Sequence, residues 1–175
     1  MRIISGKYKG KRITAPNNLP VRPTTDRAKE ALFSILDSRY YFEGKNVLDL
    51  FSGTGNLAFE FSSRGVEHIT AVDSNNNCIN FIKKTSSDLK LNITSLKSDC
   101  IKYLESCEKQ FNIIFADPPY NFEEYQKIKE IIFESNLVKK DGCLIIEHDS
   151  STSFEEDDNI EVRKYGTVHF SIFSF

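Results

Sequence analysis

Apolar residues gather in short runs along this chain, and most runs end at an acid or a glycine. Runs of roughly four to eight residues in which most positions are apolar are typical of strands buried on both faces of a parallel sheet. Strands of this kind need helices on both faces of the sheet to cover them. The pattern predicts four such strands, at residues 47–51, 68–72, 111–116 and 142–147, and the alternation with helices places a fifth, less apolar strand at residues 92–96.

Between these runs, apolar residues recur every three or four positions, which is the spacing of an amphipathic helix. Strands that alternate with helices predict an α/β fold with a doubly wound, mostly parallel, Rossmann-like sheet. The predicted helices are an N-terminal one within residues 25–42 and further ones after residue 56 and at residues 76–90, 100–107 and 123–136.

The two ends of the chain predict hairpins in place of strand–helix units. Residues 160–165 and 167–175 flank Gly166, and their alternating apolar positions predict an antiparallel hairpin that closes a seven-stranded sheet. At the other end, residues 3–14 predict a small basic hairpin arm.

The tetrapeptide Asp117-Pro118-Pro119-Tyr120 directly follows a predicted buried strand. In an open α/β sheet, ligands bind beyond the carboxyl ends of the strands, which is where this motif lies. The prolines keep the backbone extended, so Asp117 and the Pro118 carbonyl are presented as fixed hydrogen-bond acceptors. The exocyclic amine of a nucleobase has two hydrogens to donate to them, and Tyr120 offers a flat face for the base. The motif therefore indicates chemistry on a base amine.

Three further acids, Asp49, Asp73 and Asp99, lie within or just after other predicted strands. Between the first two, residues 52–55 turn a strand into a helix, and their glycine spacing also fits a dinucleotide-binding loop. Asp73 stands where a ribose-binding acid is expected for either kind of cofactor. S-adenosylmethionine carries an amino-acid end and no phosphate, so acids beside this loop favour it over a nicotinamide dinucleotide.

With these motifs the chain resembles the class I S-adenosylmethionine-dependent methyltransferases. Residues 2–6 and 22–33 are similar to motifs of the bacterial 16S ribosomal RNA guanine-N2 methyltransferases of the RsmD type, and the resemblance extends over nearly the whole chain. The residues that match the first cofactor motif are Asp49, Leu50, Phe51, Ser52, Gly53, Thr54 and Gly55.

The resemblance implies that S-adenosylmethionine is the cofactor and that particular residues bind it. It assigns Arg22 and Thr24 to the cofactor side, residues 53–55 to the methionine end, Asp73 to the ribose and Asp99 to the adenine.

The resemblance also implies the reaction, which is methylation of the exocyclic N2 of a guanine in 16S ribosomal RNA. Asp117 and the Pro118 carbonyl would hold the amine in line with the methyl group, and Tyr120 would stack on the base. The implied partner is 16S ribosomal RNA within a partly or fully assembled small subunit.

The charge of the chain is unevenly distributed. Residues 1–25 hold six basic residues and no acid, so they carry +6 of a net charge of −2, and the rest of the chain carries −8. An acidic body repels RNA, so the arm is the predicted phosphate-binding surface, with an aromatic ring available to stack on a base. The residues predicted to bind RNA are Arg2, Lys7, Tyr8, Lys9, Lys11 and Arg12.

Length and composition favour one domain, because 175 residues with 39% hydrophobic content can bury one core. We expect residues 1–24 to form the arm, residues 25–42 to carry the N-terminal helix and residues 43–175 to form the catalytic core. The sequence has neither a run of about 18 apolar residues nor the apolar region of a signal peptide, so we expect a cytoplasmic protein with no membrane partner. The four cysteines lack paired spacing, which favours reduced core thiols over a metal site or disulfides.

The residues by themselves leave two other functions open for this chain. An adenine-N6 or cytosine-N4 DNA methyltransferase uses the same kind of acceptor loop, although this chain has no obvious segment for reading a duplex sequence. A noncatalytic RNA-binding assembly module would need only the basic arm, and the presence of both the cofactor and the amine motifs argues against it.

Overall fold

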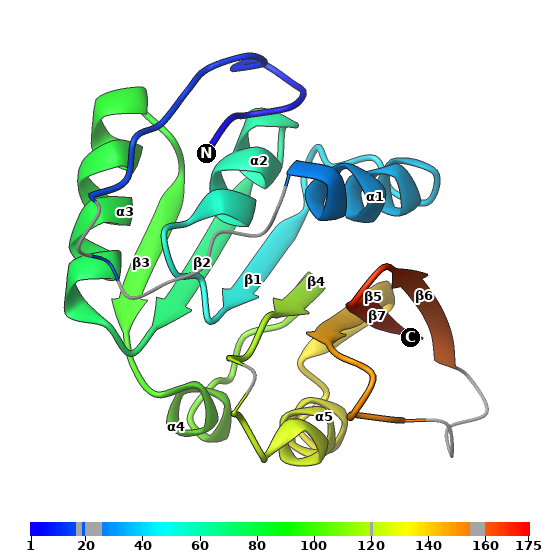
Figure 1. Ribbon diagram of the computed structural model, residues 1–175. Helices are drawn as coiled ribbons and strands as arrows, with labels where there is room; N and C mark the ends of the chain where they lie inside the picture. Colours follow the sequence, from blue (N-terminus) through cyan, green and yellow to red (C-terminus); the bar gives the residue numbers. More distant parts are fainter. Residues whose placement is uncertain (17–18, 20–25, 120, 155–159) are drawn as a thin grey trace.

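The computed structural model describes residues 1–16, 19, 26–119, 121–154 and 160–175. The described residues form one seven-stranded sheet in the order β3-β2-β1-β4-β5-β7-β6 (Figure 1). The strands are β1 (Asn46–Leu50), β2 (His68–Asp73), β3 (Ile93–Lys97), β4 (Phe111–Ala116), β5 (Val138–His148), β6 (Ile160–Tyr165) and β7 (Val168–Ser174).

Strands β1 to β5 are parallel, and β7 runs antiparallel between β5 and β6. The predicted α/β fold, with a mostly parallel sheet closed by an antiparallel hairpin, is therefore confirmed. In the register, Leu50 pairs with Ala116, and Ala116 pairs with Ile146. The carboxyl ends of β1, β4 and β5 thus align at one edge of the sheet, and this alignment positions the site.

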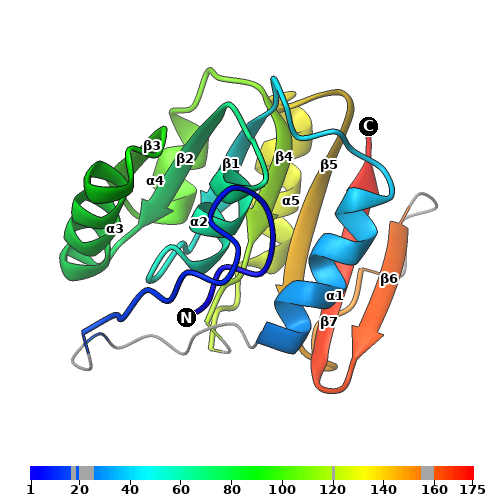
Figure 2. The ribbon, with the colours of Figure 1, turned by 90° about the horizontal axis from the view of Figure 1, so that it is seen from above.

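Five helices among the described residues cover the sheet on both faces (Figure 2). Phe33 and Phe61, from α1 and α2, belong to the hydrophobic core on one face, and Leu104 and Ile128, from α4 and α5, belong to the core on the other. The doubly wound arrangement follows, because each face of the parallel strands is apolar and needs its own layer. The helices are α1 (Asp26–Asp37), α2 (Asn56–Ser63), α3 (Asn76–Leu89), α4 (Cys100–Glu105) and α5 (Tyr125–Glu134).

The N-terminal helix lies within the segment predicted to carry it, residues 25–42. α1 ends at Asp37. The chain turns there because Phe42 is buried against two aromatic rings, with ring centroids 6.1 Å from Phe33 and 5.9 Å from Phe61. This packing brings the backbone back toward the start of β1.

The N-terminal arm is folded onto the body of the protein, although it lacks the regular strands of a hairpin. A single bridge joins Arg2 to Arg12, and the Ile3 amide donates to the Lys11 carbonyl over 2.9 Å. The Lys7 amide donates to the carbonyl of Ser63 at the end of α2 over 2.7 Å.

Gly6 makes this close approach possible. It has a φ of +80°, and a Cβ atom built on it would lie 1.8 Å from the Ser63 carbonyl oxygen. Any other residue would therefore both strain the backbone and clash with α2.

A buried polar network joins the arm to α1 and α2. Lys29 of α1 and Glu60 of α2 are both fully buried, and the Lys29 Nζ lies 3.3 Å from Glu60 Oε2. Lys29 also donates to Asn56 Oδ1 over 2.9 Å and to the Arg2 carbonyl over 2.6 Å. Burial lowers the pKa of Lys29, while the neighbouring Glu60 carboxylate opposes that shift.

Glu60 completes the network from the α2 side. Its carboxylate accepts from the amides of Ile4 and Ser5 over 2.8 and 3.0 Å, and from Arg64 Nε over 2.9 Å. The arm is therefore held in place by one buried carboxylate and one buried ammonium group.

Candidate active site

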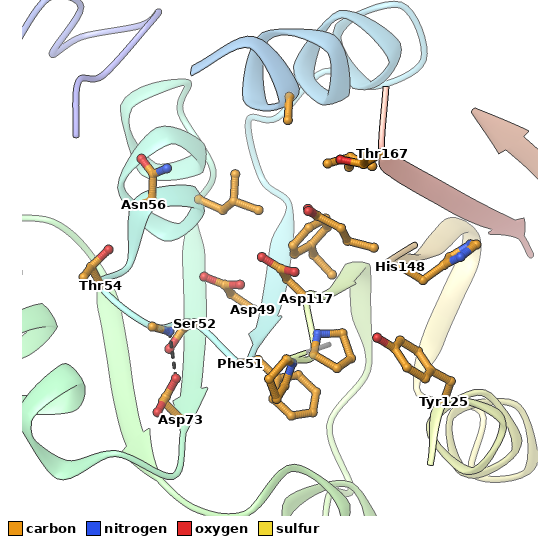
Figure 3. A pocket seen from close by; sticks show the side chains of 18 of the residues that line it. Asp49, Phe51, Ser52, Thr54, Asn56, Asp73, Asp117, Tyr125, His148 and Thr167 are labelled. Atoms are coloured by element: carbon orange, nitrogen blue, oxygen red, sulfur yellow. Dashed lines mark hydrogen bonds between the residues drawn. The ribbon is translucent and has the colours of Figure 1, made fainter. Parts of the chain in front are cut away.

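A cavity of about 860 Å³ opens at the carboxyl ends of β1, β2, β4 and β5 (Figure 3). It lies where the strand order reverses direction, with β2 on one side of β1 and β4 on the other. Crevices at such switch points are where open α/β sheets bind their ligands. The cavity is therefore the candidate active site, and most of the residues predicted for the site from the sequence line it.

The loop after β1 has residues with positive φ, a conformation that glycine adopts more easily than any other residue. Gly53 and Gly55 have φ of 50° and 76°, and Phe51 also has a positive φ of 57°. A Cβ atom on Gly55 would lie 2.9 Å from Cγ1 of Ile82 in α3 and 3.1 Å from the Phe59 ring in α2. This glycine therefore allows α2 and α3 to pack closely behind the loop, while Phe51, Ser52, Gly53 and Thr54 line the cavity in front of it.

Asp73, at the end of β2, holds this loop in place. Its Oδ2 accepts from the Gly53 amide over 2.8 Å (Figure 3), and its Oδ1 accepts from the Asn75 amide over 2.7 Å. The side chain also lines the cavity, so the acid predicted to contact a ribose has a structural role as well. Each carboxylate oxygen has a second lone pair left for a ligand.

Asp49 lies in the floor of the cavity beside Asp117 (Figure 3). Only 2% of Asp49 is exposed, and its Oδ2 is buried without a hydrogen-bond partner, as is the Oγ of Ser52. Burial raises the pKa of Asp49 well above its ordinary value, and the charges of Asp117 and Asp73 raise it further. A cationic or hydrogen-donating ligand would relieve this cost, so these two atoms mark where such a ligand is held.

A fourth acid, Glu147, lies beside Asp117 in the cavity wall. The two residues follow the paired residues Ala116 and Ile146 on neighbouring parallel strands. The Oε2 of Glu147 is buried without a hydrogen-bond partner. Burial, and then the charge of Asp117, raises the pKa of Glu147 to about 8. Glu147 was not predicted as a site residue, because it is only the last residue of the predicted strand 142–147, and β5 in fact continues to His148.

Aromatic and proline side chains form the side of the cavity near Asp117. Phe122 packs edge-on against Phe51 and Tyr125, with ring centroids 5.2 and 5.5 Å apart, and its amide donates to the Pro119 carbonyl over 2.8 Å. This contact fixes the Asp-Pro-Pro segment against the loop after β1, and Pro118 and Pro119 line the cavity. Tyr120, predicted to stack on the base, lies outside the described residues.

The opposite wall comes from the turn between β6 and β7. Tyr165, Gly166, Thr167 and Val168 line the cavity there. The turn at Gly166 was predicted from the sequence, but its position in the cavity wall was not. That position depends on the pairing of β7 with β5, which has no local signal in the sequence.

His148, next to Glu147, also lines the cavity (Figure 3), and hydrogen bonds hold its ring. Its Nδ1 lies 2.7 Å from the Asp149 carbonyl and its Nε2 lies 2.7 Å from Ser171 Oγ. Burial lowers its pKa, which favours a neutral ring that donates from Nδ1 and accepts at Nε2. This arrangement positions the ring without requiring it to transfer a proton.

Three other residues were predicted to bind the cofactor, namely Asp99, Arg22 and Thr24. Asp99 caps α4, where its Oδ1 accepts from the Lys102 amide over 3.1 Å, and it is not among the residues that line the cavity. Its predicted contact with adenine stays a prediction. Arg22 and Thr24 lie outside the described residues.

The predicted RNA-binding residues of the arm are mostly exposed. Lys7, Lys9, Lys11 and Arg12 are all exposed to solvent. Tyr8 has a tethering role that the sequence did not reveal, because its hydroxyl donates to the Leu89 carbonyl over 2.7 Å and its ring packs against the core.

Arg2 has acidic neighbours at the start of α1. Its guanidinium lies 3.5 Å from Asp26 and 3.9 Å from Glu30, and all three side chains are about half exposed. Exposed pairs of this kind are weak, so Arg2 remains able to exchange them for a phosphate.

Within the described ranges, no group of three or more histidine, cysteine or acidic side chains is arranged to hold a metal ion, and no helix has the length and apolar character needed to cross a membrane. The four cysteines are free thiols, and three of them are buried.

Comparison with known proteins connects the chain to one family. Residues 1–174 match the family described as Conserved hypothetical protein 95. The Bacillus subtilis protein YlbH is 34% identical across 99% of this chain and 98% of its own length. A protein of Buchnera aphidicola named ribosomal RNA small subunit methyltransferase D is 32% identical across 86% of this chain and 77% of its own length.

A solved structure shares the fold at lower sequence identity. It is the Thermus thermophilus 16S rRNA N2 G1207 methyltransferase RsmC in complex with AdoMet and guanosine, which matches with a TM-score of 0.70 and 18% identity over 89% of this chain and 45% of that one.

Proposed function

Because the chain belongs to the ribosomal RNA small subunit methyltransferase D family of class I S-adenosylmethionine-dependent methyltransferases, we propose that it methylates the exocyclic N2 of a guanine in 16S ribosomal RNA. The observation that carries the proposal is the cavity in which Asp117, after the end of β4, lies beside Asp49, whose buried Oδ2 has no hydrogen-bond partner. In this proposal Asp117 would accept from the base amine and Asp49 would face the cationic cofactor.

The cofactor side of the cavity fits S-adenosylmethionine. When bound, this cofactor supplies an activated methyl group on a positively charged sulfur. The buried Asp49 Oδ2 and Ser52 Oγ, both without partners, would receive the donors and the positive charge of its methionine end. The loop that Asp73 fixes leaves no basic side chain among residues 51–56, as a cofactor without phosphate allows. Asp73 keeps free lone pairs for the ribose hydroxyls.

The amine side of the cavity fits a nucleobase. The amine of guanine is a poor nucleophile because its lone pair is delocalised into the ring. Asp117 and the Pro118 carbonyl would accept its two hydrogens, which turns the lone pair toward the methyl group and stabilises the positive charge that develops on nitrogen. The proton that nitrogen loses can pass to Asp117 or to water, since the methylated amine is strongly acidic.

The substrate is supported by the family and by the charge of the arm. The Buchnera aphidicola relative is named for the small-subunit ribosomal RNA. The exposed Lys7, Lys9, Lys11 and Arg12 form a basic surface on a chain of net charge −2, and they are suited to phosphates. The base must leave its stack to reach the cavity. We propose that the natural substrate is the partly or fully assembled small subunit and that the protein works in the cytoplasm.

The test is methyl transfer with labelled S-adenosylmethionine to small subunits, and separately to bare 16S ribosomal RNA, from cells that lack this protein. We expect N2-methylguanosine in the nucleoside digest. We also expect a higher rate of methyl transfer to small subunits than to bare 16S ribosomal RNA. Methyladenosine or methylcytidine in the digest, or transfer to DNA alone, would overturn the proposal. Binding of S-adenosylmethionine without any transfer would favour the noncatalytic assembly module.

A further inference from the structure

We propose that Glu147 selects guanine by accepting the hydrogen of its ring N1, next to the amine that Asp117 holds. This inference rests on the proposed function, and it adds the group that identifies the base. Nothing in the Asp-Pro-Pro segment can do so, because adenine, cytosine and guanine all carry an exocyclic amine with two hydrogens.

The position of Glu147 is the first reason. Ala116 and Ile146 are paired on neighbouring parallel strands, so Asp117 and Glu147 are the next pair in the same register. Neighbouring strands lie about 4.8 Å apart, and side chains at paired positions point to the same face. Both residues line the cavity, so an amine held by Asp117 has Glu147 beside it.

The second reason is that one carboxylate oxygen of Glu147 has no hydrogen-bond partner among the described residues. Its Oε2 is buried and accepts no hydrogen bond from any described residue. A buried acceptor without a donor is costly, and a carboxylate in this position needs a donor from outside the chain. Two neighbouring residues do not supply one: Asp117 is itself an acid, and both ring nitrogens of His148 are engaged by the Asp149 carbonyl and Ser171.

The chemistry of the bases then indicates which donor fits. In guanine the ring nitrogen beside the amine carries a hydrogen, so N1–H and N2–H₂ form a row of donors along one edge. In adenine and cytosine the ring nitrogen beside the amine is an acceptor, which a carboxylate would repel. Two neighbouring carboxylates therefore match guanine and leave the other two bases with an unpaired acceptor.

The charge of Glu147 depends on what occupies the cavity. Burial, and then the charge of the neighbouring Asp117, raises the pKa of Glu147. A positively charged sulfonium bound in the same cavity and a donor at N1 both favour the ionised form. Glu147 is thus an acceptor when cofactor and guanine are both present.

The test compares guanine with 2-aminopurine at the target position of the RNA, once that position is mapped. 2-Aminopurine keeps the amine but lacks the N1 hydrogen. We expect the parent protein to prefer guanine by about 10²-fold or more in kcat/KM, since a site built for a hydrogen bond discriminates strongly against an analogue that lacks the donor. In Glu147→Gln the preference should fall at least tenfold, because the amide can donate to the N1 of 2-aminopurine.

Two controls keep the result interpretable. Glu134→Gln changes an exposed glutamate of α5 outside the cavity and should behave as the parent does. Titration with S-adenosylmethionine should show that Glu147→Gln binds the cofactor within a few-fold of the parent, which demonstrates a folded site.

The outcomes separate this inference from the proposed function. A parent protein that forms no N2-methylguanosine contradicts the proposed function. A parent that methylates guanine and 2-aminopurine equally well overturns the inference alone, even if the variant does not fold. A folded Glu147→Gln protein that keeps the full preference for guanine also overturns it.

Discussion

The acids of the cavity differ in what their oxygens already contact. Asp73 accepts from two backbone amides, whereas Asp49 and Glu147 each have a buried oxygen with no partner. Asp73 therefore maintains the shape of the site, and the two oxygens without partners are available to ligands. Asp117 lies close enough to Asp49 and to Glu147 for its charge to raise the pKa of both.

Replacing Asp117 with alanine tests its role in the chemical step. We expect single-turnover methyl transfer to slow by about 10²-fold or more, because an acceptor aimed at the developing charge is lost, while affinity for S-adenosylmethionine changes by only a few-fold. Asp88→Ala, at an exposed position of α3, is the matched control. A near-parental rate in a folded Asp117→Ala protein would show that this acid is not the acceptor.

The raised pKa of Glu147 predicts a dependence of stability on pH. In the unfolded chain Glu147 loses its proton near pH 4.5, whereas in the folded protein it keeps the proton up to about pH 8. The folded state therefore loses stability as the pH rises between these values, by up to about 1.4 kcal/mol per pH unit, and the loss is complete above them.

Glutamine at position 147 cannot ionise, so Glu147→Gln should gain stability over the parent steadily from pH 5 to pH 8. Urea unfolding of both proteins at several pH values measures the difference. A difference that stays constant over this range would mean that Glu147 ionises in the folded protein as easily as in water.

The residues found from the sequence are those with a local signal. Asp49, Asp73 and Asp117 stand in or directly after apolar strands, and Gly53 and Gly55 mark the loop. Glu147 had the same signal but was taken as the last residue of a strand. Tyr8 and Asp73 were assigned only ligand-binding roles, because their contacts with Leu89 and Gly53 are formed by tertiary packing.

At the scale of elements, the burial of Lys29 and Glu60 was not predicted from the sequence. The strands and helices were predictable because their apolar patterns are local. A lysine in an amphipathic helix is expected in solvent, and its burial depends on a partner that lies in another helix. The sequence therefore predicted α1 and α2 but not what joins them to the arm.

The substitution Lys29→Met tests how much the buried pair of Lys29 and Glu60 contributes to stability. We expect the free energy of unfolding to fall by about 2 to 4 kcal/mol, because the buried Glu60 carboxylate keeps Arg64 and two amides but loses its buried ammonium partner. Lys84→Met, at an exposed position of α3, should change stability by less than about 0.5 kcal/mol. Denaturant unfolding measures both, and equal stabilities would show that the pair is energetically neutral.

At the scale of the whole molecule, opposite charges are separated in space. The cavity is lined by acids, and the exposed bases of the arm are fixed to α2 through Gly6 and Glu60. An anchored arm presents its charges at a constant distance from the cavity. The phosphates of an RNA bound there would thus set which nucleotide can reach the acids.

Changing Lys7, Lys9, Lys11 and Arg12 together to glutamine tests the arm. We expect weaker RNA binding and a flatter dependence on salt, because each lost phosphate contact removes roughly 0.7 to 0.9 from the slope of log K against log salt. Binding of S-adenosylmethionine should be unchanged, since none of the four lines the cavity. Identical salt slopes for the variant and the parent would mean that RNA is held elsewhere.

The central place of β1 also has a consequence for how the protein folds. β1 pairs on one side with β2, which follows it closely, and on the other with β4, so that Val47 meets Ile113, 66 positions later (113 − 47). Contacts between distant parts of a chain form slowly because a large loop must close first. The loop of residues 51–55 needs only the early pairing with β2, whereas Asp117 reaches Asp49 only after the late one. A refolding chain should therefore recover the structure of this loop before it brings Asp117 beside Asp49, the arrangement proposed to hold a base.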